Sequence, residues 1–184
     1  MTELTKGTII LAEPFLKDPS FKRSAVLICR HSNKEGAFGF AINKLLKTKL
    51  HQIVPEITDL NLQVHLGGPM EKNTLHYIHQ YPQYLSDAER IFEGVYWGGD
   101  FELLKLHIKN GNISPQKIKF ILGYSGWSEG QLEDEILEES WILTKANKPI
   151  LFDTVAADIW RNSMIALGGK HSLMANYPTD PKLN

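Results

Sequence analysis

The chain has 184 residues, 42% of them hydrophobic and 22% charged, a composition typical of one globular domain that buries a core without disulfides or a structural metal. It carries 20 basic and 21 acidic side chains and so lacks the basic excess that proteins use against phosphates; we expect no direct binding to nucleic acid. One cysteine, Cys29, excludes an intramolecular disulfide, and no segment reaches the ~18–20 apolar residues that span a bilayer. We therefore expect a cytoplasmic protein that does not enter a membrane.

The first half of the chain predicts paired strands separated by turns. Apolar, β-branched runs predict strands over residues 7–12, 25–30 and 37–42, the last two joined by a hairpin turn. Leu46, Leu50, Ile53 and Val54 follow a helical spacing, which predicts a helix over residues 45–54. Two short strands are predicted over residues 63–66 and 75–79.

In the second half, helices are predicted singly between strands. An apolar and aromatic strand is predicted over residues 91–97, and Asp100 is suited to cap a helix that ends near Gly111. Lysines that alternate with apolar residues predict a strand over residues 117–124. The remaining predicted elements are a helix over residues 131–139, a strand over 141–144 and a helix over 154–167, which Gly168 and Gly169 end.

This order of elements differs from the regular strand–helix alternation of a doubly wound sheet. It favours an α+β fold, in which helices flank a mixed, largely antiparallel sheet that can curl into a barrel. We expect a single domain over residues 1–175 and a mobile C-terminal tail over residues 176–184, where Pro178 and Pro181 lie.

Residues 126–130 read Gly-Trp-Ser-Glu-Gly and match the G-x-S-x-G pattern of a hydrolase nucleophile, with Ser128 between a predicted strand and helix. Asp153, Asp158 and His171 follow in the order of a Ser-Asp-His triad. Ser128 and Gln131 also form a capping box, in which the hydroxyl accepts from the Gln131 amide and the Gln131 side chain reaches back to the Ser128 amide. Six acidic residues over 129–139 would oppose an oxyanion, so we favour the cap.

Three other patterns are candidates for a reactive thiol, a metal site or a cofactor site. Arg30 and His31 beside Cys29 would favour a reactive, redox-sensing or nucleophilic thiol, whereas burial would make Cys29 a small apolar core residue, which we favour. His76 and His79 form an H-x-x-H, but residues three apart in a strand point to opposite faces, so we expect no metal site. The glycine turns at residues 67–69 and 98–100 match no nucleotide-binding motif, and we expect no cofactor.

Three stretches of the chain carry a family resemblance. They comprise residues 18–24 with 29–31 and 35–43; residues 65–69 with 78–79; and residues 123–133 with 151–153 and Trp160. In this order and spacing, over about residues 7–168, the chain resembles the YqgE/AlgH family of bacterial proteins.

The resemblance implies a small cytoplasmic α+β protein without an established enzymatic activity. Some members carry the label of transcriptional regulator, but this chain shows no helix-turn-helix signature and no basic recognition helix. The family pattern admits residues other than serine at position 128. The chain departs from that pattern at Lys44-Leu45, where Arg-Pro is more common, and at Arg30, where an acid is common.

We therefore favour a non-enzymatic binding or regulatory protein, with a protein or a small molecule as partner. We expect its site in a cleft where the three stretches meet, lined by polar and glycine residues that packing alone does not demand: Arg23, Ser24, His31, Asn43, Gly67, Gly68, Trp127 and Gln131. Replacing Arg23 or Asn43 by alanine should then change stability by less than about 1 kcal/mol. The alternative is a small hydrolase or a thiol-reactive, redox-sensing protein that uses Ser128 or Cys29.

Overall fold

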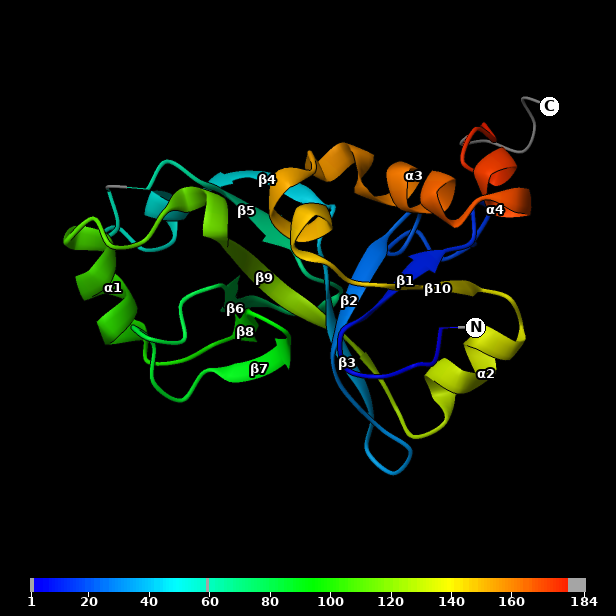
Figure 1. Cartoon of the computed structure of the whole chain (residues 1–184), viewed down its shortest axis with the longest axis horizontal. Helices are drawn as coiled ribbons and strands as arrows, with labels where there is room; N and C mark the ends of the chain where they lie inside the picture. The colour runs from blue at the N-terminus through cyan, green and yellow to red at the C-terminus, as the bar shows by residue number, and fades with distance from the viewer. Residues whose placement is uncertain (1, 59, 179–184) are drawn as a thin grey trace.

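Ten strands form one sheet over residues 2–58 and 60–178, which are the residues described by the computed structural model (Figure 1). The strands are β1 (Thr8–Ala12), β2 (Ala25–Ser32), β3 (Gly36–Ala41), β4 (Leu45–Lys49), β5 (Gln63–Leu66), β6 (Met70–His79), β7 (Glu89–Phe92), β8 (Val95–Trp97), β9 (Ile118–Trp127) and β10 (Trp141–Lys145). The α-helices are α1 (Phe101–Lys109), α2 (Gln131–Leu137), α3 (Ala156–Leu167) and α4 (Gly169–Met174). Shorter helical segments are η1 (Leu50–Gln52), η2 (Pro115–Lys117) and the π-helical η3 (Pro149–Asp153).

The sheet is mixed and largely antiparallel, which confirms the predicted α+β class. Its strands follow the order β10-β1-β2-β3-β9-β6-β8-β7. β5 pairs in parallel with β9, and β4 pairs antiparallel with β5. Over the described ranges the sheet does not close into a barrel.

β9 joins the two halves of the sheet. Its first half pairs with β6 and β5, and its last residues pair with β3, where Ala37 lies opposite Trp127. Gly123 lies between these parts with a φ of +68°, and a Cβ there would lie 2.5 Å from the Met70 carbonyl oxygen. Glycine fits both the angle and the contact, and the change of partner strand follows one residue later, between Tyr124, which pairs with β6, and Ser125, which pairs with β3.

Both faces of β1 and β2 are buried. On one face, Ile9 and Leu27 pack with Trp160 of α3, and on the other face Ile10 lies in a cluster with Leu132 of α2. Strands that are covered on both faces need apolar residues throughout, which explains the unbroken apolar runs of the sequence. In Figure 1, α3 lies above β1 and β2, α2 lies at the lower right, and α1 covers the left end beside β6 and β8.

The helix predicted over residues 45–54 is wrong. Residues 45–49 form β4, in which alternate residues are exposed, and only the following residues turn into η1. The Leu66 N–H donates to the Lys44 carbonyl at 2.7 Å, where β5 runs beside β4. Pairing with β5 thus supplies the backbone hydrogen bonds, and this tertiary contact outweighs the helical spacing of the apolar residues.

Three further differences concern single segments. The strand predicted over residues 91–97 is a hairpin of β7 and β8, turned at Gly94 with a φ of +73°. α3 ends at Leu167 before Gly168, as predicted, but a further helix that was not predicted, α4, follows at once. In the predicted mobile tail, Tyr177 stacks on Phe15 with 5.7 Å between ring centroids, and residues 179–184 lie outside the described residues.

No helix in the described part of the chain has both the length and the apolar character needed to cross a membrane.

Candidate functional site

An aromatic pocket of about 560 Å³ lies between β6, the end of β8 and the start of α1. Nine residues line this pocket, and none of the nine is Asp, Glu, Lys, Arg, Ser or Cys: Ile53, Val54, Leu75, His76, Tyr77, Trp97, Gly98, Gly99 and Phe101. Its size falls in the range of small-molecule sites, which are mostly apolar with a few polar groups. We call it the aromatic pocket.

A rigid glycine turn forms one side of the aromatic pocket. Gly98 and Gly99 have φ angles of +70° and +109°, a region that other residues rarely adopt. The Tyr77 hydroxyl donates to the Gly99 carbonyl at 2.6 Å, and the Gly98 N–H donates to the Tyr77 carbonyl at 3.0 Å. Asp100 accepts from the Leu103 N–H at 3.0 Å, so it caps α1 as predicted and fixes the helix against the turn. Burial raises the pKa of Tyr77 to about 12, which keeps the phenol protonated.

Behind the pocket, side chains from four strands make an aromatic cluster. The Phe38 ring lies 4.9 Å from the Trp97 ring and 4.8 Å from the Tyr124 ring, and the Phe40 ring lies 5.0 Å from the His76 imidazole. Burial lowers the pKa of His76, so its imidazole is neutral at physiological pH. Its Nε2 is buried without a hydrogen-bond partner, which leaves one unsatisfied polar atom in an otherwise apolar wall.

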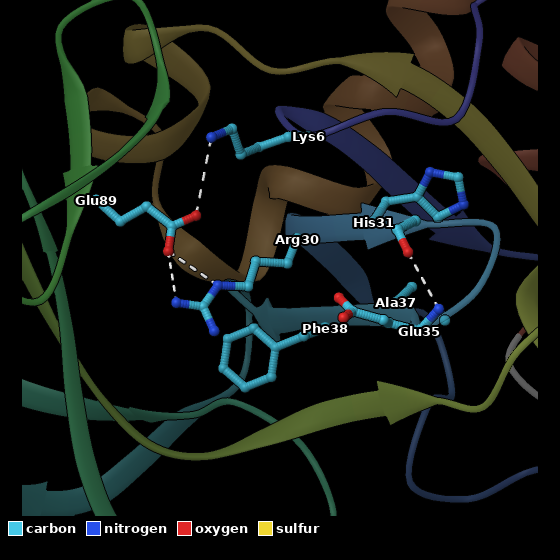
Figure 2. Close-up of a pocket in the computed structure, with 9 residues that line it drawn as sticks. Lys6, Arg30, His31, Glu35, Ala37, Phe38 and Glu89 are labelled. Carbon is cyan, nitrogen blue, oxygen red and sulfur yellow. Dashed lines mark hydrogen bonds and ion pairs between the residues drawn. The ribbon is translucent and has the colours of Figure 1, made fainter.

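A second, polar pocket of about 370 Å³ has the Phe38 ring in its wall, together with Lys6, Arg30 and Glu89 (Figure 2). Arg30 donates to one Glu89 oxygen from Nε at 2.8 Å and from Nη2 at 2.6 Å, and Lys6 lies 3.8 Å from the other oxygen. This hydrogen bonding to Glu89 raises the pKa of Arg30. Figure 2 shows Lys6 and Arg30 reaching the same carboxylate from two sides. Glu35 also lines this pocket, so the two carboxylates of Glu35 and Glu89 balance the two cations of Lys6 and Arg30. The pocket therefore has no excess of positive charge that would attract an anion.

Trp97 connects the two pockets. Its ring lines the aromatic pocket and contacts Phe38 of the polar pocket, and the Arg30 guanidinium lies 4.8 Å from its centroid. A cation over the face of an indole adds a favourable interaction. Because Glu89 holds Arg30 in this place, the charged pair also fixes the position of the Trp97 ring.

Comparison with known proteins identifies the family. The AlgH-like family matches residues 9–172. The chain belongs to the AlgH-like family. It is 40% identical to a UPF0301 protein of Cytophaga hutchinsonii over 98% of this chain and 100% of the relative, and 37% identical to one of Chlorobium limicola over 99% and 97%.

Two solved structures share the fold. Protein DIP2367 from Corynebacterium diphtheriae superposes with a TM-score of 0.80 at 19% identity, over 96% of this chain and 94% of that chain. The AlgH protein from Pseudomonas aeruginosa superposes with a TM-score of 0.73 at 23% identity, over 97% and 98%. At these identities the two structures support the AlgH-like fold alone.

The structure divides the eight predicted ligand residues of this AlgH-like chain among three places. Arg23, Ser24 and Asn43 lie together at the start of β2 and the end of β3. Asn43 accepts from the Ala25 N–H at 2.9 Å and donates to the Arg23 carbonyl at 2.8 Å. The Arg23 side chain donates to the Tyr177 carbonyl and lies 4.9 Å from the Trp160 ring, and Ser24 is fully buried.

Gly67 and Gly68 lie beside the end of β3 and the middle of β9. A Cβ at Gly67 would lie 2.3 Å from the Gly123 carbonyl oxygen, and one at Gly68 would lie 2.2 Å from the Tyr124 carbonyl oxygen. The Gly67 carbonyl accepts from the Ala41 N–H at 2.8 Å and from the Ser125 hydroxyl at 2.9 Å. Close approach of backbones therefore requires glycine at both positions.

His31, Trp127 and Gln131 lie at the hairpin end of β2 and β3, against α2. His31 Nε2 lies 2.7 Å from Glu133, and Trp127 Nε1 donates to Glu135 at 2.9 Å. Of the eight residues, His31 alone lines the polar pocket, and none lines the aromatic pocket. The eight do not share one cleft among these two pockets, and their role in binding stays a prediction.

The predicted cap at Ser128 is half right. The Gln131 side chain accepts from the Ser128 N–H at 3.0 Å, as expected. The Ser128 hydroxyl does not accept from the backbone N–H of Gln131. That N–H donates instead to the Ser128 carbonyl at 3.1 Å. The reason is that α2 begins only at Gln131, after Gly130 with a φ of +72°, so Ser128 lies in a turn before the helix. Its hydroxyl is exposed, 3.4 Å from the Gln131 side-chain oxygen, and no histidine of the described residues hydrogen-bonds to it.

Cys29 is buried, which confirms the favoured interpretation. Its side chain has no exposed area, and its sulfur lies 3.7 Å from the Leu27 carbonyl oxygen. Burial raises the pKa of the thiol well above its ordinary value, so the reactive thiolate is not formed at neutral pH. His76 and His79 lie on β6, and the described part of the chain contains no group of three metal-ligating side chains.

Sequence reasoning missed the aromatic pocket. Its walls come from three stretches that are distant in the sequence, residues 53–54, 75–77 and 97–101. A signal was present, since two aromatic residues flank the Gly-Gly-Asp turn, but only the fold shows that they face a hollow.

Proposed function

We propose that this AlgH-like protein is a binding protein, which holds a planar apolar group of a small molecule in the aromatic pocket. The main support for this proposal is the pocket itself. It measures about 560 Å³, its walls include the rings of Tyr77, Trp97 and Phe101, and it is lined by no Asp, Glu, Lys or Arg. An aromatic ligand can stack on these rings and gain the stabilisation that aromatic pairs give beyond their buried area.

A regulatory role through this ligand, and not through DNA, is part of the proposal. A duplex-binding surface needs several unpaired cations. In the polar pocket beside Trp97, Arg30 and Lys6 are instead engaged by Glu89. A ligand in the aromatic pocket would contact Trp97 and could thereby change the position of Arg30 at the surface.

A hydrolase or thiol-reactive protein is the weaker alternative. Ser128 has an exposed hydroxyl but no hydrogen-bonded base among the described residues, and the Cys29 thiol is buried and protonated. This alternative predicts that a fluorophosphonate labels Ser128 or that iodoacetamide labels Cys29 in the folded protein at neutral pH. Labelling of neither residue would remove it.

The proposal is tested with 2-naphthol, a neutral planar probe, whose affinity is measured by ligand-observed NMR. We expect the wild-type chain to bind it and Phe101→Ala to bind about tenfold more weakly, because one aromatic wall is lost. Leu106→Ala is the matched control, since Leu106 lies on the same helix but is 49% exposed and outside the pocket. Equal affinities of the wild type and Phe101→Ala would contradict the proposal.

A further inference from the structure

A buried His65 and a partly buried Lys119 form a pair in a small cavity that shares no lining residue with the aromatic pocket. Lys119 comes from β9 and His65 from β5, the two strands that pair in parallel, and Lys119 Nζ lies 3.3 Å from His65 Nε2. The cavity measures about 90 Å³ and is bounded by both side chains, by Phe120 and by Phe152 of η3.

The surroundings of Lys119 lack a compensating charge. Over the ranges that the structure describes, no carboxylate lies within salt-bridge distance of Nζ. A lysine that is buried without a partner is less costly as the neutral amine than as the ammonium ion, and burial lowers the pKa of Lys119 to about 8. A neutral primary amine is a nucleophile, whereas an ammonium ion is not.

His65 is a neutral hydrogen-bond acceptor for this amine. Burial, followed by the charge of Lys119, lowers the pKa of His65 to about 3, so the imidazole does not protonate at neutral pH. Its Nε2 can therefore accept one N–H of Lys119, which fixes the amine in the cavity wall. His65 is thus a positioning residue for the amine.

We infer that Lys119 is a carbonyl-reactive site, which forms an imine with a short-chain aldehyde that enters this cavity. The lone pair of Nζ attacks the carbonyl carbon, a C–N bond forms, and the carbonyl oxygen takes up the proton that the nitrogen releases. The resulting carbinolamine loses its hydroxyl group and the second nitrogen proton as water. The balance is one amine and one aldehyde to one imine and one water, with no oxidant or reductant.

The size of the cavity selects the aldehyde. The cavity is much smaller than the aromatic and polar pockets, at about 90 Å³ against about 560 and 370 Å³. An aldehyde of two or three carbons fits this space, and a bicyclic aromatic aldehyde does not. This inference does not rest on the proposed function, because the two sites use different residues.

The experiment treats the full chain with propanal and cyanoborohydride, which reduces an imine to a stable alkylamine, and measures each lysine by peptide mass spectrometry. At about pH 7 an amine with a pKa of about 8 is about one-tenth neutral, whereas an ordinary lysine is less than about one-thousandth neutral. We expect Lys119 to be alkylated about tenfold faster than Lys117, its exposed neighbour. The rate at Lys119 should level off above about pH 8.

Two variants and a second aldehyde complete the test. Lys119→Arg should remove the fast site, and Lys117→Arg should leave it unchanged. His65→Gln, which keeps an acceptor, should retain more of the rate advantage than His65→Leu, with folding of each variant checked by circular dichroism. Replacing propanal by 2-naphthaldehyde should abolish the preference for Lys119. A wild-type Lys119 that reacts no faster than Lys117 with propanal would overturn the inference whatever the variants show.

Discussion

Asn43 stabilises a turn with both ends of its side-chain amide. Its oxygen accepts from the N–H of the fully buried Ala25, and its nitrogen donates to the Arg23 carbonyl. Asn43→Ala would leave this buried N–H without a partner, so we expect the free energy of unfolding to fall by about 1–3 kcal/mol. Urea denaturation measures it, with Asn33→Ala as the control, because Asn33 is exposed in the β2–β3 turn. A loss below about 1 kcal/mol would instead favour the predicted ligand role of Asn43.

At the scale of elements, α2 is held to the sheet by its carboxylates. Glu135 accepts from the indole N–H groups of Trp127 and Trp141 at 2.9 and 2.7 Å, and Glu133 pairs with His31 of β2 at 2.7 Å. The hydrogen bond from His31 lowers the pKa of Glu133 below its ordinary value. The acidic run of this helix, which argued against an oxyanion at Ser128, therefore serves in part to attach the helix.

This attachment predicts a dependence of stability on pH. Because the pKa of Glu133 is lowered in the folded state, its contribution is complete above the pKa of an unfolded glutamate, about 4.3, and is lost as the pH falls through the lowered folded pKa. The Glu133 side chain is 35% exposed, so the pair contributes about 1 kcal/mol or less. We expect the Tm difference between the wild type and Glu133→Gln to be largest near about pH 6 and to shrink toward about pH 3.

The matched control is Glu129→Gln, since Glu129 is exposed before α2 and has no salt-bridge partner among the described residues. Its Tm should follow the wild type at every pH. A Glu133→Gln difference that persists unchanged at low pH would show that the carboxylate charge is not what holds the helix.

Local sequence patterns predict some of these elements but not others. Buried strands such as β1, β2 and β9, and the Asp100 cap of α1, follow from alternation, apolar runs and capping preference. β4 does not, because its strand state depends on β5, a partner about fifteen residues away that no local spacing reveals. The start of α2 at Gln131 was predicted correctly, but the Ser128 hydroxyl does not cap the helix, since Gly130 with its left-handed angle lies between them.

For the whole molecule, the sequence predicted the α+β class and the family but not the candidate site. Family motifs led to Gly67, Gly68 and Asn43, which the structure explains through backbone contacts within the fold. The aromatic pocket forms only when β6, β8, α1 and the segment after η1 come together. The spacing of residues along the sequence does not show that these segments meet, so the pocket could not be predicted before the fold was known.

Binding of an aromatic ligand in the aromatic pocket can be measured directly through the indole N–H signals of the four tryptophans. Three indole N–H groups donate within the protein, Trp127 and Trp141 to Glu135 and Trp160 to the Ala12 carbonyl at 2.8 Å. Trp97 lines the aromatic pocket. In ¹H–¹⁵N NMR spectra recorded during a titration with 2-naphthol, we predict that the Trp97 indole signal shifts progressively while the other three stay in place. A titration in which the Trp97 signal does not move, or moves no more than those of Trp127, Trp141 and Trp160, would contradict binding in this pocket.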